Sequence, residues 1–329
     1  MKTRITEMLG IEYPILCGGM YRLCHPELCA AISNAGALGN LTATNWQTKE
    51  EFQAAFDETN ELTDKPIWVN VTLLPALEFG GEHYGMYFET IAENKPAAVE
   101  IGGVPLDRYE GGKYLKMLQD AGVKVIHKVG AVRHAKHAEA AGYDAVLCAG
   151  WEEGGHPLGD DVTAMVLTQR MVEEIKIPII AVGGQGTGRG LAAALSLGAD
   201  GIMFASPFIC VDECEVHIKA KEELVRRQEF DTTCYGKSHG LQGRALKNPS
   251  IEKVHELEAQ GAEFKEILPH IAGKWGPNIW KDGDMSTGAV NVGQSIGLIH
   301  DIVSSKVLID RIVKEAKEAL AEANKRMLG

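Results

Sequence analysis

The chain has 329 residues, with 33 Lys and Arg against 45 Asp and Glu, which gives a formal net charge of −12. Apolar residues make up 45% and charged residues 24% of the chain, so a globular core can form and disordered or coiled-coil classes are excluded. The acidic balance argues against nucleic acid as a partner, because no surplus of Lys and Arg is present to neutralise phosphates.

The cysteines and the hydropathy pattern narrow the class further. None of the seven cysteines forms a CxxC pair, so the sequence predicts no metal site and reduced thiols. The first residues lack an apolar stretch, and no run approaches the roughly 18 apolar residues that span a bilayer. We therefore expect a cytoplasmic protein with a small-molecule substrate and no membrane partner, and we consider a homodimer as its assembly.

Eight short apolar runs bounded by Gly or Pro predict β-strands along the first two thirds of the chain. The expected strands cover residues 14–19, 37–41, 66–71, 97–101, 124–129, 145–149, 178–182 and 201–205. Helical patterns follow the strands, for example at 26–36 and 49–61. Strands that are apolar on both faces and alternate with helices indicate a parallel sheet. Eight such units favour an α/β fold of the (β/α)8 or TIM-barrel type over an open, doubly wound sheet.

The alternation ends after the eighth expected strand. A charged helix is expected at 213–227, and residues 228–300 are predicted to form a mostly helical insertion over one side of the barrel. The apolar stripe within 304–327, which includes Leu320 and Met327, predicts a last helix that packs against the barrel. We assign 1–227 and 301–329 to the barrel domain and 228–300 to the helical insertion.

Glycine-rich loops are expected at the carboxyl ends of the strands, where the active site of such a barrel lies. Gly183-Gly184-Gln185-Gly186 follows the seventh strand, and Ala205-Ser206 follows the eighth. Neighbouring loops of this kind hold phosphate groups with backbone N–H donors, since glycine has no Cβ to block the approach. Tight turns are the alternative explanation. The GxGxxG spacing of a dinucleotide-binding fold is absent.

Two side chains at the same end of the barrel suggest chemistry. His156 follows Gly154-Gly155 after the sixth strand, and we predict an acid/base or proton-donor role for it. Lys128 lies near the end of the fifth strand and is suited to a ring that becomes anionic on reduction. The alternative for Lys128 is a salt bridge, for instance to Glu100.

A series of ordered motifs resembles the nitronate monooxygenase family, formerly called 2-nitropropane dioxygenase, which includes flavin-dependent enoyl-acyl-carrier-protein reductases of type II. The resemblance covers nearly the whole chain. Its motifs are Gly18-Gly19-Met20, Ala30-Ala31-Ile32-Ser33-Asn34-Ala35-Gly36, Val69-Asn70, Glu153-Gly154-Gly155-His156, Gly183-Gly184, Gly198-Ala199-Asp200-Gly201, Lys247-Asn248-Pro249 and Gly293-Gln294-Ser295-Ile296-Gly297-Leu298-Ile299.

The resemblance implies a TIM barrel that holds non-covalent FMN. The FMN contacts implied by motif position are Gly19, Met20, Asn70, Lys128, Gly155, Gly183, Gly184, Ala205 and Ser206. Lys128 would lie near the pyrimidine side of the ring, and His156 would face the reactive flavin nitrogen as the catalytic residue. The chain departs from the family pattern at Ala205-Ser206-Pro207, where GTR is usual, and at Trp151-Glu152-Glu153, which is bulkier and more acidic.

The resemblance leaves three functions open. The first, which is the function we expect, is an FMN-dependent monooxygenase that oxidises small alkyl nitronates with O2. The second is a reductase in which NAD(P)H reduces FMN, which then reduces an enoyl thioester or a quinone. The third is a flavin-binding sensor without catalysis. The net charge of −12 does not select one of the three functions. It gives no support to a basic patch that would bind an acyl carrier protein.

Overall fold

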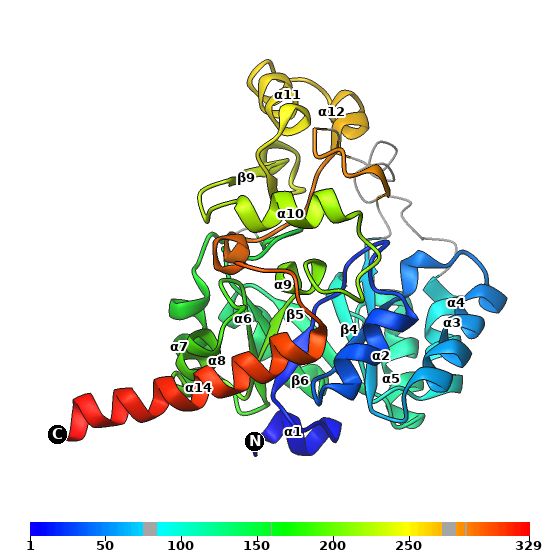
Figure 1. Cartoon of the computed structure of the whole chain (residues 1–329). Helices are drawn as coiled ribbons and strands as arrows, with labels where there is room; N and C mark the ends of the chain where they lie inside the picture. The colour runs from blue at the N-terminus through cyan, green and yellow to red at the C-terminus, as the bar shows by residue number, and fades with distance from the viewer. Residues whose placement is uncertain (75–83, 159, 272–280, 287) are drawn as a thin grey trace.

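The computed structural model of the chain describes residues 1–74, 84–158, 160–271, 281–286 and 288–329. Its centre is a ring of eight strands, all parallel, in the order β1-β8-β7-β6-β5-β4-β3-β2 (Figure 1). The strands are β1 (Ile15–Cys17), β2 (Gly39–Thr42), β3 (Ile67–Leu73), β4 (Ala98–Gly103), β5 (Lys124–Val129), β6 (Ala145–Ala149), β7 (Ile179–Val182) and β8 (Gly201–Phe204). A parallel bridge between Leu16 and Leu38 closes the ring between β1 and β2. The TIM barrel expected from the sequence is confirmed.

Helices surround the ring. The α-helices are α1 (Arg4–Leu9), α2 (Pro26–Asn34), α3 (Lys49–Leu62), α4 (Tyr84–Asn94), α5 (Lys113–Asp120), α6 (Val132–Ala141), α7 (Ala164–Glu174), α8 (Gly188–Ser196), α9 (Ser206–Ile209), α10 (Ile218–Arg226), α11 (Pro249–Ala259), α12 (Phe264–Ile271) and α14 (Ser305–Leu328). Short 3-10 helices are η1 (Ala43–Asn45), η3 (Tyr109–Gly112), η4 (Lys237–His239) and η5 (Gln294–Leu298). No helix within the described ranges is long and apolar enough to cross a membrane.

The lower part of the barrel interior is apolar. Residues that alternate along a strand point to the same face, and the inward ones form one buried cluster that includes Leu38, Trp68 and Leu147. Ile5 and Leu9 of α1 belong to the same cluster and close the amino end of the barrel, at the bottom of Figure 1. The opposite, carboxyl end is therefore the open end.

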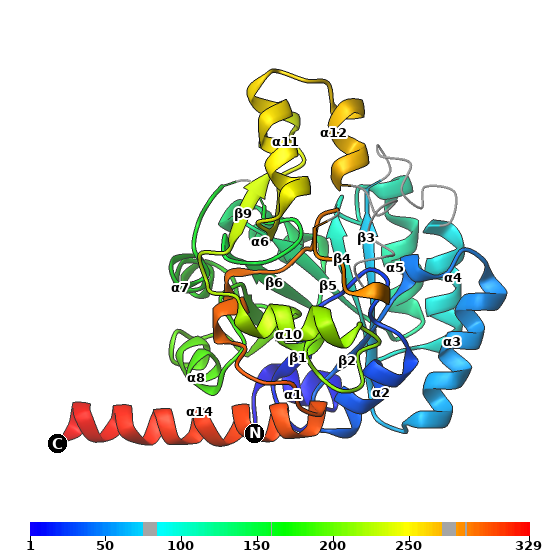
Figure 2. The same ribbon diagram turned by 45° about the horizontal axis from the view of Figure 1, so that its top comes forward.

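The insertion after β8 rises above the carboxyl end of the barrel (Figure 2). It contains the expected helices α11 and α12, and also an antiparallel hairpin of β9 (Thr232–Tyr235) and β10 (Gly243–Leu246), which the sequence analysis missed. Each strand has four residues, and the connection holds Gly236 and Gly240 at positive φ. Such short strands give no readable alternation pattern. Residues 272–280 and 287 of the expected insertion lie outside the described residues, and the domain boundaries at 227 and 300 stay a prediction.

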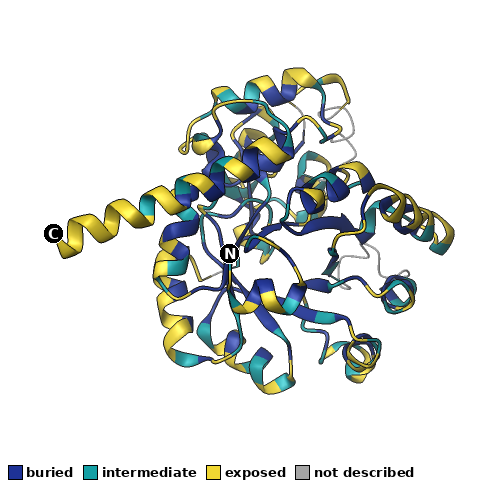
Figure 3. Ribbon diagram, turned by 60° about the horizontal axis from the view of Figure 1, so that its bottom comes forward, coloured by how far each residue is buried: buried dark blue, intermediate teal, exposed yellow. Residues whose placement is uncertain are grey.

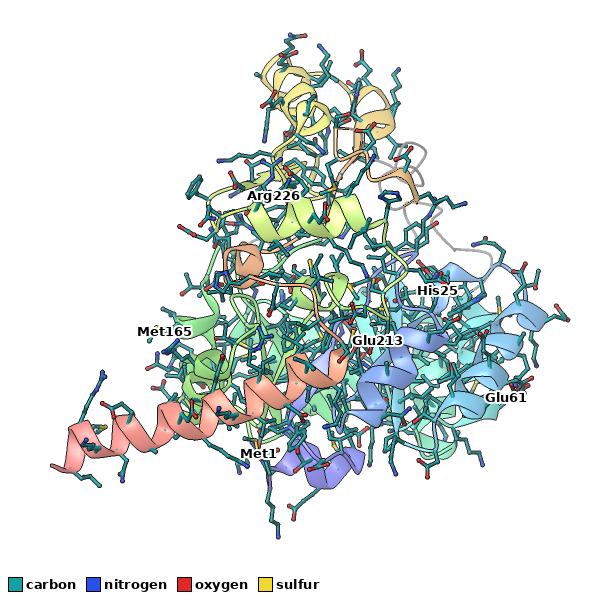
Figure 4. The ribbon with its side chains drawn as sticks, in the orientation of Figure 1. Met1, His25, Glu61, Met165, Glu213 and Arg226 are labelled. Carbon is teal, nitrogen blue, oxygen red and sulfur yellow. The ribbon has the colours of Figure 1, made fainter. Side chains whose placement is uncertain are left out.

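The helix expected at 213–227 is shorter than predicted. α10 begins after His217, whose Nδ1 accepts a hydrogen bond from the Lys219 N–H at 3.2 Å. Glu213, labelled in Figure 4, turns instead toward α14 and accepts hydrogen bonds from the N–H and hydroxyl of Ser305, both at 2.9 Å. The carboxylate thereby satisfies a free donor in the first turn of α14.

The last helix is only partly packed against the barrel. Ile309, Ile312 and Ala316 of α14 are buried, whereas Leu320 is 38% and Met327 83% exposed. Figure 3 shows the exposed end of α14 projecting beyond the barrel. The prediction that the whole apolar stripe packs against the barrel is therefore wrong for its last third, because the helix is longer than the surface beneath it.

Candidate active site

The inward positions above the apolar layer form the floor of the barrel mouth. Side chains two residues apart along a strand share a face, so these positions lie two residues beyond the inward apolar ones, at or just after the strand ends. They are Gly18, Asn40, Asn70, Glu100, Lys128, Ala149, Gly184 and Ala205. The positions from β2 to β5 are polar, and those from β6 to β8 and β1 are small. The floor therefore has a polar half, from β2 to β5, and a small half, from β6 to β8 and β1. In the small half no large side chain keeps a ligand away from the backbone.

Asn70 and Glu100 form the centre of the polar half. They pair in register across β3 and β4 and are only 6% and 4% exposed. The backbone of Gly19 packs on the Asn70 side chain. A Cβ on residue 19 would lie 2.3 Å from the side-chain amide carbon of Asn70, so no larger residue fits at position 19 without movement. Burial raises the pKa of Glu100 to about 7, against the lowering effects of Lys128, Asn70 and the Gly19 N–H. Glu100 is therefore partly protonated at neutral pH.

Lys128 joins the polar half to the loop after β6. Its Nζ donates hydrogen bonds to Oε1 of Glu153 at 3.0 Å and to the backbone oxygen of His156 at 3.2 Å. Burial opposes the charge of Lys128, but the attraction of Glu153 and Glu100 outweighs burial and raises the pKa of Lys128. The salt bridge considered for this lysine thus forms with Glu153, and Glu100 acts on it only through its field.

His156 stands at the open side of the mouth. Its side chain is exposed, and it follows Gly155, whose φ of +79° favours glycine. The surrounding protein, and then the charge of Lys128, lower the pKa of His156 to about 4. The imidazole is therefore neutral at pH 7, with one nitrogen as a hydrogen-bond donor and the other as an acceptor.

The small half of the floor is built from loop backbone. Gly183 and Gly184 have φ of +97° and +66°, and a Cβ on Gly183 would meet the oxygen of Gly150 at 3.0 Å. Gly184 and Gly19 are exposed, so their backbone is open to a ligand.

Two of the expected contact residues already have internal partners. The Met20 N–H donates to Oγ1 of Thr42 at 3.1 Å, and the hydroxyl of Ser206 accepts from the Gly293 N–H at 3.0 Å. The Ser206 oxygen thus fixes the returning insertion, while its own hydroxyl proton can still be donated.

The insertion clamps the loop that carries His156. Gly155 and Arg244 of β10 form an antiparallel bridge, with N–H to oxygen distances of 3.1 and 2.6 Å. A Cβ on Gly154 would lie 2.5 Å from the nitrogen of Gly293, so this glycine is needed for the close approach. The loop is therefore held from below by Lys128 and from above by the insertion.

The departure at Trp151-Glu152-Glu153 has a structural explanation. The guanidinium of Arg244 lies over the Trp151 ring, 4.8 Å from its centroid. Glu152 accepts from the Ala164 N–H at 2.9 Å, at the start of α7, and Glu153 pairs with Lys128. All three side chains thus form contacts that hold the loop after β6 in place. At the other departure, Ser206 begins the short helix α9 and Ala205 is its N-terminal cap residue.

The mouth fits a flat ring that carries a phosphate. A Cβ on Gly155 would meet no protein atom within 4 Å, and the backbone of Gly19 and Gly184 is exposed. Oε2 of Glu100 is buried without a hydrogen-bond partner among the described residues, so the protein itself does not fully satisfy this carboxyl group. These features match the group that the sequence resemblance implies.

Comparison with known proteins establishes the family. The sequence model described as nitronate monooxygenase matches residues 2–315 of the chain. The chain belongs to the nitronate monooxygenase family. It is therefore an oxidoreductase, as the sequence analysis predicted, and the sensor without catalysis finds no support among its relatives.

The relatives carry different reaction names. A probable nitronate monooxygenase of Staphylococcus saprophyticus is 28% identical, with 97% of this chain and 99% of the relative covered. A protein of Rhodococcus jostii, also 28% identical with 96% of each chain covered, is named a 5-hydroxy-7a-methyl-1-oxo-octahydro-1H-indene-4-carboxyl-CoA dehydrogenase. The structure of FabK from Thermotoga maritima is 34% identical over 99% of both chains, with a TM-score of 0.90. A nitroalkane oxidase structure from Streptomyces ansochromogenes, 24% identical with a TM-score of 0.79, shares the fold.

The residues expected at the site lie together at the carboxyl end of the barrel. The sequence indicated no role for Glu153 or Arg244, and it indicated Glu100 as a salt-bridge partner for Lys128. One signal for Glu100 was present, since it lies two residues after the inward-facing Ala98. No sequence signal marks Arg244, because its place depends on how the insertion folds back.

Proposed function

We propose that the protein is an FMN-dependent reductase that uses NAD(P)H to reduce a neutral, conjugated carbonyl compound, either an enoyl thioester or a quinone. The observation that carries the proposal is the charge of the mouth. Among the eight floor positions Lys128 is the one cation, and it is already paired with Glu153, while Glu100 adds a second carboxyl. His156 is neutral. An anionic nitronate would find no unpaired cation among these eight floor positions, whereas a neutral acceptor needs none.

The cofactor would rest on the small half of the floor. The exposed backbone of Gly19 and Gly184 and the space at Gly155 would receive the ring and the phosphate, with Ala205 and Gly183 completing the bed. When bound, FMN supplies a hydride acceptor for NAD(P)H and a hydride donor for the substrate. Lys128 would lie near the ring edge that becomes electron-rich.

His156 would bind the carbonyl oxygen of the substrate. A neutral imidazole N–H is a suitable donor to an oxygen on which negative charge develops. Its low pKa makes His156 a poor source of protons at pH 7. Reduction of a C=C bond consumes one hydride and one proton, so the proton for the carbon next to the carbonyl would come from solvent at the open side of the mouth.

One relative supports a thioester substrate. The Rhodococcus jostii protein is named for an oxidation–reduction of a carboxyl-CoA compound, and it aligns over almost the whole chain. The second candidate, nitronate oxidation, is favoured by the family description and by the name of the Staphylococcus saprophyticus relative.

Anaerobic stopped-flow spectroscopy separates the two candidates. FMN-loaded protein is mixed with NADH, with NADPH or with an alkyl nitronate, and the flavin absorbance is followed. We expect bleaching by a reduced nicotinamide and none by the nitronate. Bleaching by the nitronate alone would overturn the reductase proposal in favour of nitronate oxidation. Protein that fails to bind FMN at all would contradict both.

A further inference from the structure

Three of the expected FMN contacts surround one carboxyl group. Asn70 pairs with Glu100 across β3 and β4, Lys128 approaches from β5, and the Gly19 N–H from the end of β1. Glu100 lies on the same floor as these residues but has no part in the resemblance. It is thus placed beside the group that the mouth would hold.

The environment of Glu100 disfavours a permanent negative charge. The side chain is 4% exposed, and Oε2 has no hydrogen-bond partner within the described part of the chain. An ionised carboxylate with such an oxygen loses its hydration without replacement. The protonated form avoids that cost.

The charged groups that face Glu100 come from two elements. Lys128 of β5 lowers its pKa, and Glu153 of the loop after β6 raises it. Lys128 donates its hydrogen bond to Glu153, so those two charges largely cancel. The other two neighbours, Asn70 on β3 and Gly19 after the end of β1, are neutral. The net charge of the cluster therefore depends on whether Glu100 holds a proton.

We propose that Glu100 is a positioning residue that sets the electrostatic field at the flavin by taking up a proton from solvent when the ring becomes negatively charged. With Glu100 protonated, the cluster is neutral and the ring can accept negative charge. With Glu100 ionised, the cluster carries one negative charge and opposes it. The pKa of about 7 places this change in the physiological range. The inference rests on the proposed function, because it requires bound FMN.

The test is the reduction potential of bound FMN between pH 5.5 and 8.5 in the wild type, Glu100→Gln and Glu93→Gln. Glu93 is an exposed residue of α4 that pairs with Lys49, so its substitution removes the same charge elsewhere. At pH 8, and at a fixed potential of a reference dye, we expect about a tenfold higher ratio of reduced to oxidised flavin in Glu100→Gln than in the wild type. At pH 5.5 the two should agree, and Glu93→Gln should follow the wild type throughout. Equal potentials in Glu100→Gln and wild type at pH 8 would overturn the inference.

A second measurement uses the wild type alone, in case the variant fails to fold. The infrared difference spectrum between reduced and oxidised protein at pH 8 should gain the C=O stretch of a protonated carboxyl. A spectrum without this band would overturn the proton uptake. Failure of the proposed function is recognised separately, because then no FMN binds or reduced nicotinamide leaves it oxidised.

Discussion

Lys128 illustrates how one side chain stabilises the site and limits its chemistry. Its ion pair with Glu153 is buried, with side-chain exposures of 15% and 6%. A buried pair gains little over apolar residues of the same shape, but removal of one partner leaves an uncompensated charge. The pair is therefore best understood as the device that fixes the His156 loop, to which Lys128 also donates a hydrogen bond.

Substitution of Lys128 by Met should lower the free energy of unfolding by about 3 kcal/mol, because Glu153 stays buried without its cation. Urea unfolding at pH 8 measures this loss. The double variant Lys128→Met/Glu153→Gln should recover most of it, since no buried charge remains. A double variant as unstable as the single one would show that the ion pair does not account for the effect.

The His156→Ala variant should still bind FMN, but its kcat/KM should be about 100-fold lower, because one hydrogen-bond donor to the developing oxyanion is lost. Because the surrounding protein and the charge of Lys128 hold the pKa of His156 near 4, the imidazole stays neutral from pH 6 to 9. The ratio of wild-type to variant kcat/KM should therefore be constant over that range. A ratio that falls as pH rises through 6.5 would mean that the charged imidazolium is the active form.

At the residue scale, the sequence predicted where the side chains of the site lie, but not which residues they pair with. His156 and Lys128 could be selected because glycine pairs and strand ends mark the mouth of a barrel. No partner could be assigned to Glu153, because its burial and its pairing depend on the turn of the loop after β6. Ionic partners on different strands are set by the stagger of the barrel, which residue types do not encode locally.

At the scale of elements, the close contact between α8 and α14 fixes how the last helix packs on the barrel. Gly188, the first residue of α8, lies against α14, where a Cβ would be 2.3 Å from the Cβ of Glu315 and 2.4 Å from the backbone oxygen of Ile312. The Gly188 N–H also donates to the Glu315 carboxylate at 3.1 Å. The start of α8 is thus capped by the last helix of the chain.

Substitution of Gly188 by Ala should destabilise the protein by about 2 kcal/mol, because the added methyl group forces two backbones apart. Gly190→Ala, on the same helix, is the matched control, since its Cβ would meet the flexible side-chain oxygen of Gln185. Thermal unfolding of both variants measures the difference. Equal melting temperatures would contradict the close packing of α8 and α14.

Strands and helices with a strong pattern were predictable, and those shaped by tertiary contacts were not. The expected strands at 124–129 and 145–149 match β5 and β6 in both bounds. The hairpin of β9 and β10 was not predicted, because it is held by the bridge between Arg244 and Gly155, a contact that the local sequence does not show. The charged helix was placed too early because the Glu213 carboxylate binds the start of α14, a contact invisible in the local sequence.

At the scale of the whole molecule, the barrel separates stability from chemistry. The apolar layer and α1 fill the amino end, while the carboxyl end combines a polar half, a glycine-rich half and an insertion that holds the loop carrying His156. The sequence indicates this division, because the inward positions of each strand pass from apolar to small or polar residues within two positions. The reaction was not predictable, because it depends on the charge balance of side chains from several strands.

The reaction of reduced flavin with acceptors tests the central claim most directly. FMN-loaded protein is reduced anaerobically and then mixed with equal concentrations of a quinone, an enoyl-CoA or O2, and the return of the flavin absorbance is timed. We predict that at least one of the two neutral conjugated acceptors reoxidises the flavin faster than O2 does. Reoxidation by O2 alone, together with reduction by a nitronate, would contradict the account.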